Sequence, residues 1–173
     1  MRKTHRKCFD KFTKKPAYSG FFRFLCVYLR YIFVFKMLKK LIIAIDFDGT
    51  CVTHEFPNVG KDIGAVRVLK ALIDSGHKLM LWTMRSQKQP AQLQDAVNWF
   101  ESNGLPIIGV NQNPDQHWSS SPKQYAQLYI DDAALGCPLK FHVSISERPF
   151  VDWEKVEEIL TESGVITYTK DIL

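Results

Sequence analysis

Two carboxylates and a threonine stand close together in the ten residues from 41 to 50, LIIAIDFDGT. Asp46 and Asp48 are separated by one residue, and in an extended chain two such side chains point to the same side. Carboxylates about 5 Å apart repel each other by roughly 3 kcal/mol at an effective dielectric near 20. They therefore favour a shared proton, a bound cation or both. The alternative is a strand that ends in an ordinary polar turn, because Asp and Gly are common turn formers.

The residues before these carboxylates predict how the carboxylates are positioned. Leu41 to Ile45 form a short apolar run, which is typical of a strand buried on both faces of a parallel sheet. Gly49 allows a sharp turn directly after the strand and a close approach of the backbone to a ligand. The sequence thus predicts a catalytic or metal-binding loop at the end of a buried strand.

The rest of the chain alternates predicted strands and helices, which favours an α/β fold. We expect a three-layer α/β/α sandwich with a mainly parallel, Rossmann-like sheet. In such sheets the site lies at the carboxyl ends of the strands, and three predicted strand ends carry polar side chains. A polar loop without periodicity covers 111–122. The predicted strands are 41–45, 78–83, 106–110, 127–130 and 141–145, and the predicted helices are 62–75, 91–103 and 151–160.

The polar strand ends follow a fixed order along the chain. D-x-D-G-T at 46–50 is followed by Thr83, then by Lys123, then by the pair Asp131–Asp132. This order resembles the four motifs of the haloacid dehalogenase superfamily of phosphohydrolases, and the likeness covers roughly residues 41–135. The segments between the motifs have no room for a cap domain, so the chain looks like a small capless member with an open site. The loop 51–60 could then act as a small flap.

The resemblance implies a Mg²⁺-dependent phosphatase that hydrolyses a phosphomonoester through an aspartyl-phosphate intermediate. Asp46 would be the nucleophile, because a carboxylate that attacks phosphorus divides one difficult step into two. Asp48 would protonate the leaving oxygen and later activate water. Thr83 would hydrogen-bond a phosphoryl oxygen, and Lys123 would neutralise charge on the nucleophile and the phosphate.

The resemblance also implies the ligands of the cation. Mg²⁺ prefers oxygen ligands, which Asp46, the backbone carbonyl of Asp48 and Asp131 would supply. Asp132 would be either a second ligand through water or an orienting partner. Substrate binding is assigned to three further residues: Gly49, Thr50 and Arg85. For Arg85, a place on the surface is an equal alternative.

Each candidate has a structural alternative. Thr83 could simply close a strand, Lys123 could be a solvated loop lysine, and the Asp131–Asp132 pair could cap a helix. His54 is predicted to be solvated or structural.

Two other families and one other class of protein compete with this interpretation. Receiver domains combine similar residues, but there the acidic pair precedes the lone Asp. A true dehalogenase would not need an acid at Asp48. The functional alternative is a non-catalytic module of the same fold, tethered to a membrane or a partner by its N-terminal leader.

The net charge of +5 is unevenly distributed. Residues 1–40 carry +11, whereas residues 41–173 carry −6. The predicted domain is therefore acidic, and no nucleic-acid-binding face is evident. The four cysteines are scattered without metal-site spacing, which favours a reduced, cytoplasmic protein.

Residues 1–36 form a basic and aromatic leader that we separate from a predicted hydrolase domain at 37–173. Its apolar part, 21–35, contains two arginines and is too short for a regular membrane span. Three interpretations stay open: translation starts at Met37, the leader is a peripheral membrane or partner helix, or, least favoured, it spans the membrane. The identity of the phosphorylated substrate is open, and so is a homo-oligomer, since capless sites are often closed by a partner subunit.

Overall fold

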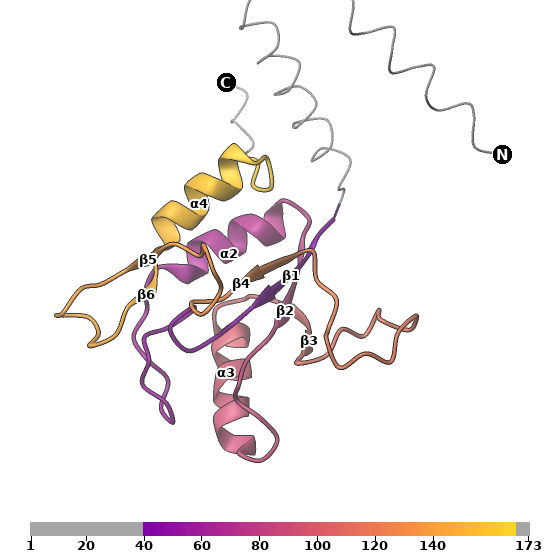
Figure 1. The fold of residues 1–173 in the computed structure, drawn as a ribbon, viewed down its shortest axis with the longest axis horizontal. Helices are drawn as coiled ribbons and strands as arrows, with labels where there is room; N and C mark the ends of the chain where they lie inside the picture. The colour runs from indigo at the N-terminus through magenta and orange to yellow at the C-terminus, as the bar shows by residue number, and fades with distance from the viewer. Residues whose placement is uncertain (1–39, 169–173) are drawn as a thin grey trace, which may run out of the picture. The chain divides into compact units, whose positions relative to one another are not determined.

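The computed structural model describes residues 40–168, which are built around a four-stranded sheet (Figure 1). All of its strands are parallel, and their order is β3-β2-β1-β4. The strands are β1 (Ile42–Ile45), β2 (Lys78–Leu81), β3 (Ile107–Val110) and β4 (Leu128–Ile130). This order makes β1 a central strand, as its continuous apolar run predicts.

Helices cover both faces of this sheet. Helices α2 (Ala65–Asp74) and α4 (Trp153–Glu162) lie on one face, and α3 (Pro90–Ser102) lies on the other (Figure 1). The predicted three-layer α/β/α fold is therefore confirmed. Phe47, at the end of β1, packs edge-to-face on Trp99 of α3 with ring centroids 5.7 Å apart. This aromatic contact fixes the start of the D-x-D-G-T loop on the core.

The helix boundaries differ from the predicted ones by a few residues. Helix α2 begins at Ala65, three residues after the predicted start, because Gly64 has a left-handed backbone (φ 91°) that no helix continues through. Its buried residues are Ala65, Val68, Leu69 and Leu72. The buried residues of α3 are Leu93, Ala96 and Phe100.

The predicted fifth strand at 141–145 is wrong. A small antiparallel sheet forms on either side of it instead, from β5 (Leu139–Lys140) and β6 (Phe150–Val151). The intervening segment turns back, since the carbonyl of His142 accepts hydrogen bonds from the N–H groups of Ile145 and Ser146. Pairing in β6 also delays α4, which begins at Trp153 and not at the predicted Val151.

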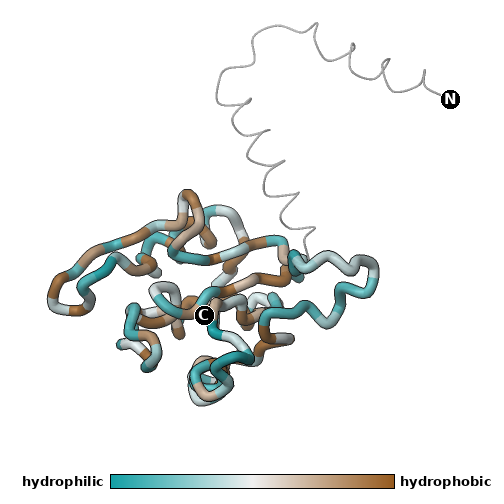
Figure 2. Tube along the Cα trace, turned by 60° about the horizontal axis from the view of Figure 1, so that its bottom comes forward, coloured by the Kyte–Doolittle hydropathy of each residue, from teal (hydrophilic) through white to brown (hydrophobic). Residues whose placement is uncertain are grey.

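The predicted loop after β3 is confirmed and is largely hydrophilic (Figure 2). The predictions for the leader, residues 1–36, lie outside the described residues. Within 40–168, no helix has the length and apolar character needed to cross a membrane.

Candidate metal centre and active site

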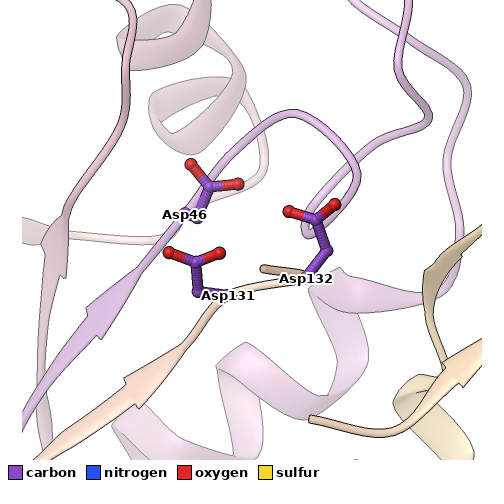
Figure 3. Close-up of side chains that lie close together, drawn as sticks. All are labelled: Asp46, Asp131 and Asp132. Atoms are coloured by element: carbon purple, nitrogen blue, oxygen red, sulfur yellow. The ribbon is translucent and has the colours of Figure 1, made fainter. Parts of the chain in front are cut away.

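Three carboxylates converge at the C-terminal ends of the two neighbouring strands β1 and β4 (Figure 3). Asp46 directly follows β1, and Asp131 and Asp132 directly follow β4. One carboxylate oxygen of each residue lies within 4.8 Å of those of the other two. We call these three residues the acidic triad. The triad joins the first and fourth motifs singled out in the sequence.

The pairing of β1 with β4 brings the triad together. Ile45 is the register partner of Ile130, so the next residue of each strand is an aspartate. The pairing continues one step beyond the strands, where the N–H of Asp46 donates to the carbonyl of Ile130 at 3.0 Å. The Thr50 hydroxyl donates to Asp46 Oδ2 and accepts from the N–H of Asp132, both at 3.0 Å. Thr50 thereby ties the two strand ends to each other.

The surroundings of Asp46 disfavour the negatively charged form of its carboxyl group. Burial is the main reason that the pKa of Asp46 rises from its ordinary value of 3.8 to about 7. The charges of Asp131 and Asp132 raise this pKa further, whereas hydrogen bonds from the Phe47 backbone and the Thr50 hydroxyl lower it. A bound cation would relieve both the burial of charge and the repulsion.

The residues present fit a hard divalent cation. The triad offers only carboxylate oxygens, which are the ligands that Mg²⁺ prefers. Among the ion pairs of residues 40–168, none involves Asp46 or Asp131, so no protein cation neutralises these two carboxylates. The triad can therefore hold a metal ion through Asp46, Asp131 and Asp132.

Asp48 lies outside the triad and is held by a buried arginine. Arg85 donates from Nε to Asp48 Oδ2 at 2.8 Å and from Nη2 to Asp48 Oδ1 at 2.7 Å. Its remaining N–H groups donate to the carbonyls of Asn58, Gln92 and Pro57. The surface alternative for Arg85 is wrong, because its side chain is 1% exposed. All five guanidinium N–H groups have partners within the protein, so in this conformation none is free for a phosphate.

Thr83 follows β2 and is fixed by an asparagine that the sequence analysis did not single out. Asn111 Oδ1 accepts from the N–H of Thr83 at 2.7 Å, and Asn111 Nδ2 donates to the Thr83 carbonyl at 2.8 Å. The same amide group donates to the Arg85 carbonyl at 3.2 Å. Thr83 Oγ1 accepts from the N–H of Arg85, which leaves the Thr83 hydroxyl proton free to donate. Asn111 thus holds the backbone of the second motif.

Replacing Asn111 with Gly is expected to lower the free energy of unfolding by about 1–3 kcal/mol, because three hydrogen bonds to backbone groups are lost. Glycine keeps the left-handed backbone of this position (φ 52°), so this variant removes the amide alone. Urea denaturation measures the change, with Gln112→Gly at the exposed neighbouring position as the control. Equal stabilities of the two variants would contradict a positioning role for the Asn111 amide.

Lys123 lies on the loop between β3 and β4, and its side chain is exposed. The described contacts of this residue are made by its backbone, since its N–H donates to Ser121 Oγ and its carbonyl accepts from Gln116 Nε2. None of the ion pairs of residues 40–168 joins Lys123 to the acidic triad. Its role in charge neutralisation stays a prediction.

His54 approaches the triad from the loop after β1. Its Nε2 lies 3.0 Å from Asp132 Oδ2, and its side chain is 15% exposed. The ring rests on Gly49, where an added Cβ would stand 2.1 Å from Nε2 and the backbone is left-handed (φ 86°). The glycine is therefore required by both the turn and the histidine. Of the two alternatives for His54, solvated or structural, the structure supports the structural one. Its position four residues after Thr50, in the loop of the first motif, was the available signal.

The helix-cap alternative for the second acidic pair is also wrong. No helix begins at Asp131 or Asp132, and Asp131 Oδ1 accepts from the N–H of Ala133 at 2.8 Å in a turn. The structure brings four of the predicted site residues together. The carboxylate oxygens of Asp46, Asp131 and Asp132 lie within 4.8 Å of one another, and Thr50 hydrogen-bonds to both Asp46 and Asp132. Asp48 and Arg85 form a separate pair beside them.

Neither protein-family models nor curated proteins matched the chain. Among solved structures, a conserved protein coded by a locus of Bacteroides thetaiotaomicron is similar, with 32% sequence identity and a TM-score of 0.57. The similarity covers 76% of this chain and 99% of the bacterial one. The chain belongs to the family of this bacterial protein. Membership of this family establishes the fold, and the function has to be inferred from the site.

Proposed function

We propose that the protein is a Mg²⁺-dependent phosphatase that hydrolyses a phosphomonoester through a phosphorylated Asp46. The observation that supports this most strongly is the acidic triad, in which the half-buried Asp46 faces Asp131 and Asp132 at the C-terminal edge of a parallel sheet. A second carboxylate, Asp48, follows two residues after the first. This combination suits a nucleophile next to a cation, with a separate acid–base group nearby.

In the proposed reaction, an oxygen of Asp46 attacks phosphorus as the bond to the leaving oxygen breaks, and Asp48 gives a proton to that oxygen. Water then attacks the phosphorylated Asp46 and gives a proton to Asp48, which releases inorganic phosphate and the free carboxylate. When bound, Mg²⁺ would supply stabilisation of the negative charge that builds on the phosphoryl oxygens. The Thr83 hydroxyl, whose proton is free, would donate to one of these oxygens.

Within this proposal Arg85 is a positioning residue. Both oxygens of Asp48 accept N–H groups of Arg85, at 2.8 and 2.7 Å. Asp48 then has to give up part of this pair whenever it carries the proton, and the pair re-forms when the proton leaves. This use of Arg85 replaces the direct phosphate contact expected from the sequence, because its N–H groups are already occupied.

The proposal is tested by phosphate release from p-nitrophenyl phosphate by the full chain. We expect turnover with Mg²⁺ and none in EDTA. Asp131→Asn removes one carboxylate of the triad and should raise the Mg²⁺ concentration for half-maximal rate at least tenfold, in the range known for altered metal sites. Asp95→Asn, at an exposed position of α3, is the matched control and should leave this concentration unchanged. Metal-independent turnover, or none at all over a broad panel of phosphomonoesters, would rule out the proposed function.

A further inference from the structure

A cavity of about 420 Å³ lies between two loops of the described chain. One wall comes from the loop after β1, through His54, Glu55 and Lys61, and the other comes from residues 143–148 between β5 and β6. Figure 1 shows both loops on the side where β1 ends. We call this space the loop cavity. Its volume falls within the range of about 300–1,000 Å³ that small-molecule sites occupy.

The loop cavity is one side chain away from the triad. His54 lines the cavity, and its Nε2 lies 3.0 Å from Asp132 Oδ2. A phosphomonoester whose phosphoryl group lies at the triad can therefore place its alcohol portion in the cavity. One wall follows the first motif in the chain and the other follows the fourth, and neither contains a motif residue, so the four motifs themselves do not describe this space.

Hydrogen bonds within and between the two loops hold the cavity open. Lys61 Nζ donates to the Ile145 carbonyl at 3.0 Å and thereby joins the walls. The backbone of Lys61 pairs with Thr53, whose N–H donates at 3.0 Å and whose Oγ1 accepts at 2.8 Å. The N–H of Val151 donates to the Gly49 carbonyl at 2.9 Å, which ties β6 to the D-x-D-G-T turn. The cavity is thus pre-formed, which lowers the cost of binding.

The charges of the lining balance. Two basic side chains, Lys61 and Arg148, face two acidic ones, Glu55 and Glu147, in the same cavity. A second phosphate would call for an excess of positive charge, and this lining has none. Carboxylates accept hydrogen bonds from hydroxyl groups, while lysine and arginine donate to them. The balance therefore favours a neutral ligand with many hydroxyl groups.

The remaining residues that line the cavity also favour a hydroxyl-rich ligand. The hydroxyl-bearing Ser144 and Ser146 contribute to the wall, and the apolar contribution comes from Val143 and Ile145. Apart from the imidazole of His54, the lining has no aromatic ring on which a nucleobase could stack. We propose that the loop cavity binds the alcohol portion of a sugar or polyol monophosphate. This inference rests on the proposed phosphatase function, because that function places the phosphate at the triad.

Equilibrium binding tests the inference without requiring turnover. The probes are glucose 6-phosphate, glycerol 3-phosphate, AMP and acetyl phosphate, measured by calorimetry at a Mg²⁺ concentration that saturates the variant used, the full chain carrying Asp46→Asn. We expect glucose 6-phosphate or glycerol 3-phosphate to bind at least tenfold more tightly than acetyl phosphate and than AMP. Ser144→Trp, added to this protein, fills the cavity and should abolish the preference. Ser120→Trp, at an exposed position on the loop after β3, is the control and should retain it.

Two outcomes separate the cavity inference from the proposed function. If p-nitrophenyl phosphate is hydrolysed by the unmodified protein with Mg²⁺, but the probes bind without preference or AMP binds most tightly, the cavity inference is overturned and the phosphatase stands. If the sugar or polyol phosphate binds selectively and Ser144→Trp removes the selectivity, but no phosphomonoester of the panel is hydrolysed, the cavity inference holds and the phosphatase is overturned. A preference that survives Ser144→Trp also overturns the cavity inference.

Discussion

Replacing Asp46 with Asn is expected to abolish turnover while it makes the metal-free protein more stable above pH 7. The loss of activity follows from the proposed role of Asp46 as nucleophile, and removal of a nucleophile lowers kcat by 10³-fold or more, as an order of magnitude. The gain in stability follows from burial, which raises the pKa of Asp46 to about 7 in the folded protein.

The sign of the stability effect is set by the proton. The folded state holds the proton of Asp46 more tightly than the unfolded state, in which the pKa is near 3.8. The contribution of Asp46 to stability is therefore fully present below about pH 4 and is lost as the pH rises through about 7. The difference between the two pKa values corresponds to about 4 kcal/mol at most, since Asp46 keeps some contact with solvent. Asn carries no charge at any pH, so the variant Asp46→Asn does not lose this stability as the pH rises.

Urea denaturation in EDTA at pH 5 and pH 8 measures the effect. Between the two pH values, the free energy of unfolding of the unmodified protein should fall by about 2–4 kcal/mol more than that of Asp46→Asn. Asp95→Asn, which is exposed, should behave like the unmodified protein. Adding Mg²⁺ at pH 8 should restore stability to the unmodified protein and much less to Asp46→Asn. Parallel pH profiles of the two proteins would show that Asp46 does not carry a buried charge.

Replacing Arg85 with Met is expected to destabilise the protein by about 3–5 kcal/mol, because it leaves the half-buried carboxylate of Asp48 without its partner. The double variant Arg85→Met/Asp48→Asn should cost less than the sum of the two single variants, since it removes both charges of the pair. Arg85→Lys should not restore the contact, because an ammonium group cannot form the two parallel hydrogen bonds of the guanidinium. Urea denaturation of the unmodified protein, Arg85→Met, Asp48→Asn and the double variant gives the coupling energy between the two side chains.

An exposed ion pair provides the control for this cycle. Arg67 pairs with Glu157 but its side chain is 62% exposed, so Arg67→Met should cost less than about 1 kcal/mol. Activity gives a second readout of Arg85 as a positioning residue. We expect Arg85→Lys to lower kcat much more than it raises KM, because Asp48 is misplaced while the phosphate site is intact. Additive stabilities in the cycle together with an unchanged kcat would contradict the positioning role.

Much of the site was predictable from local patterns. The apolar run before Asp46 specified a strand buried on both faces, and the alternation of such runs with helices specified a parallel sheet. Because parallel strands end at a common edge, the aspartates at 46, 131 and 132 could be expected to meet before any coordinates were known. The alternating residues of 141–145 were misleading for the same local reason: alternation alone does not provide a partner strand, and the segment forms a turn.

Side-chain partnerships between distant segments were not predictable in this way. Whether Arg85 reaches solvent, phosphate or Asp48 depends on where residues 37 positions apart come together, and the sequence spacing does not encode this. The same holds for Asn111 with Thr83 and for His54 with Asp132. The loop cavity likewise exists only because Lys61 meets Ile145 across 84 residues.

By itself, the sequence determined the parallel α/β framework and the acidic edge, since both follow from periodicity and from the ends of strands. Only the tertiary structure decided which carboxylate is free. Register places Asp46 opposite the pair after β4, where three carboxyl groups lie within 4.8 Å of one another without a cation of the described chain on Asp46 or Asp131. Packing places the buried Arg85 on Asp48 instead, where all five N–H groups of the guanidinium have partners.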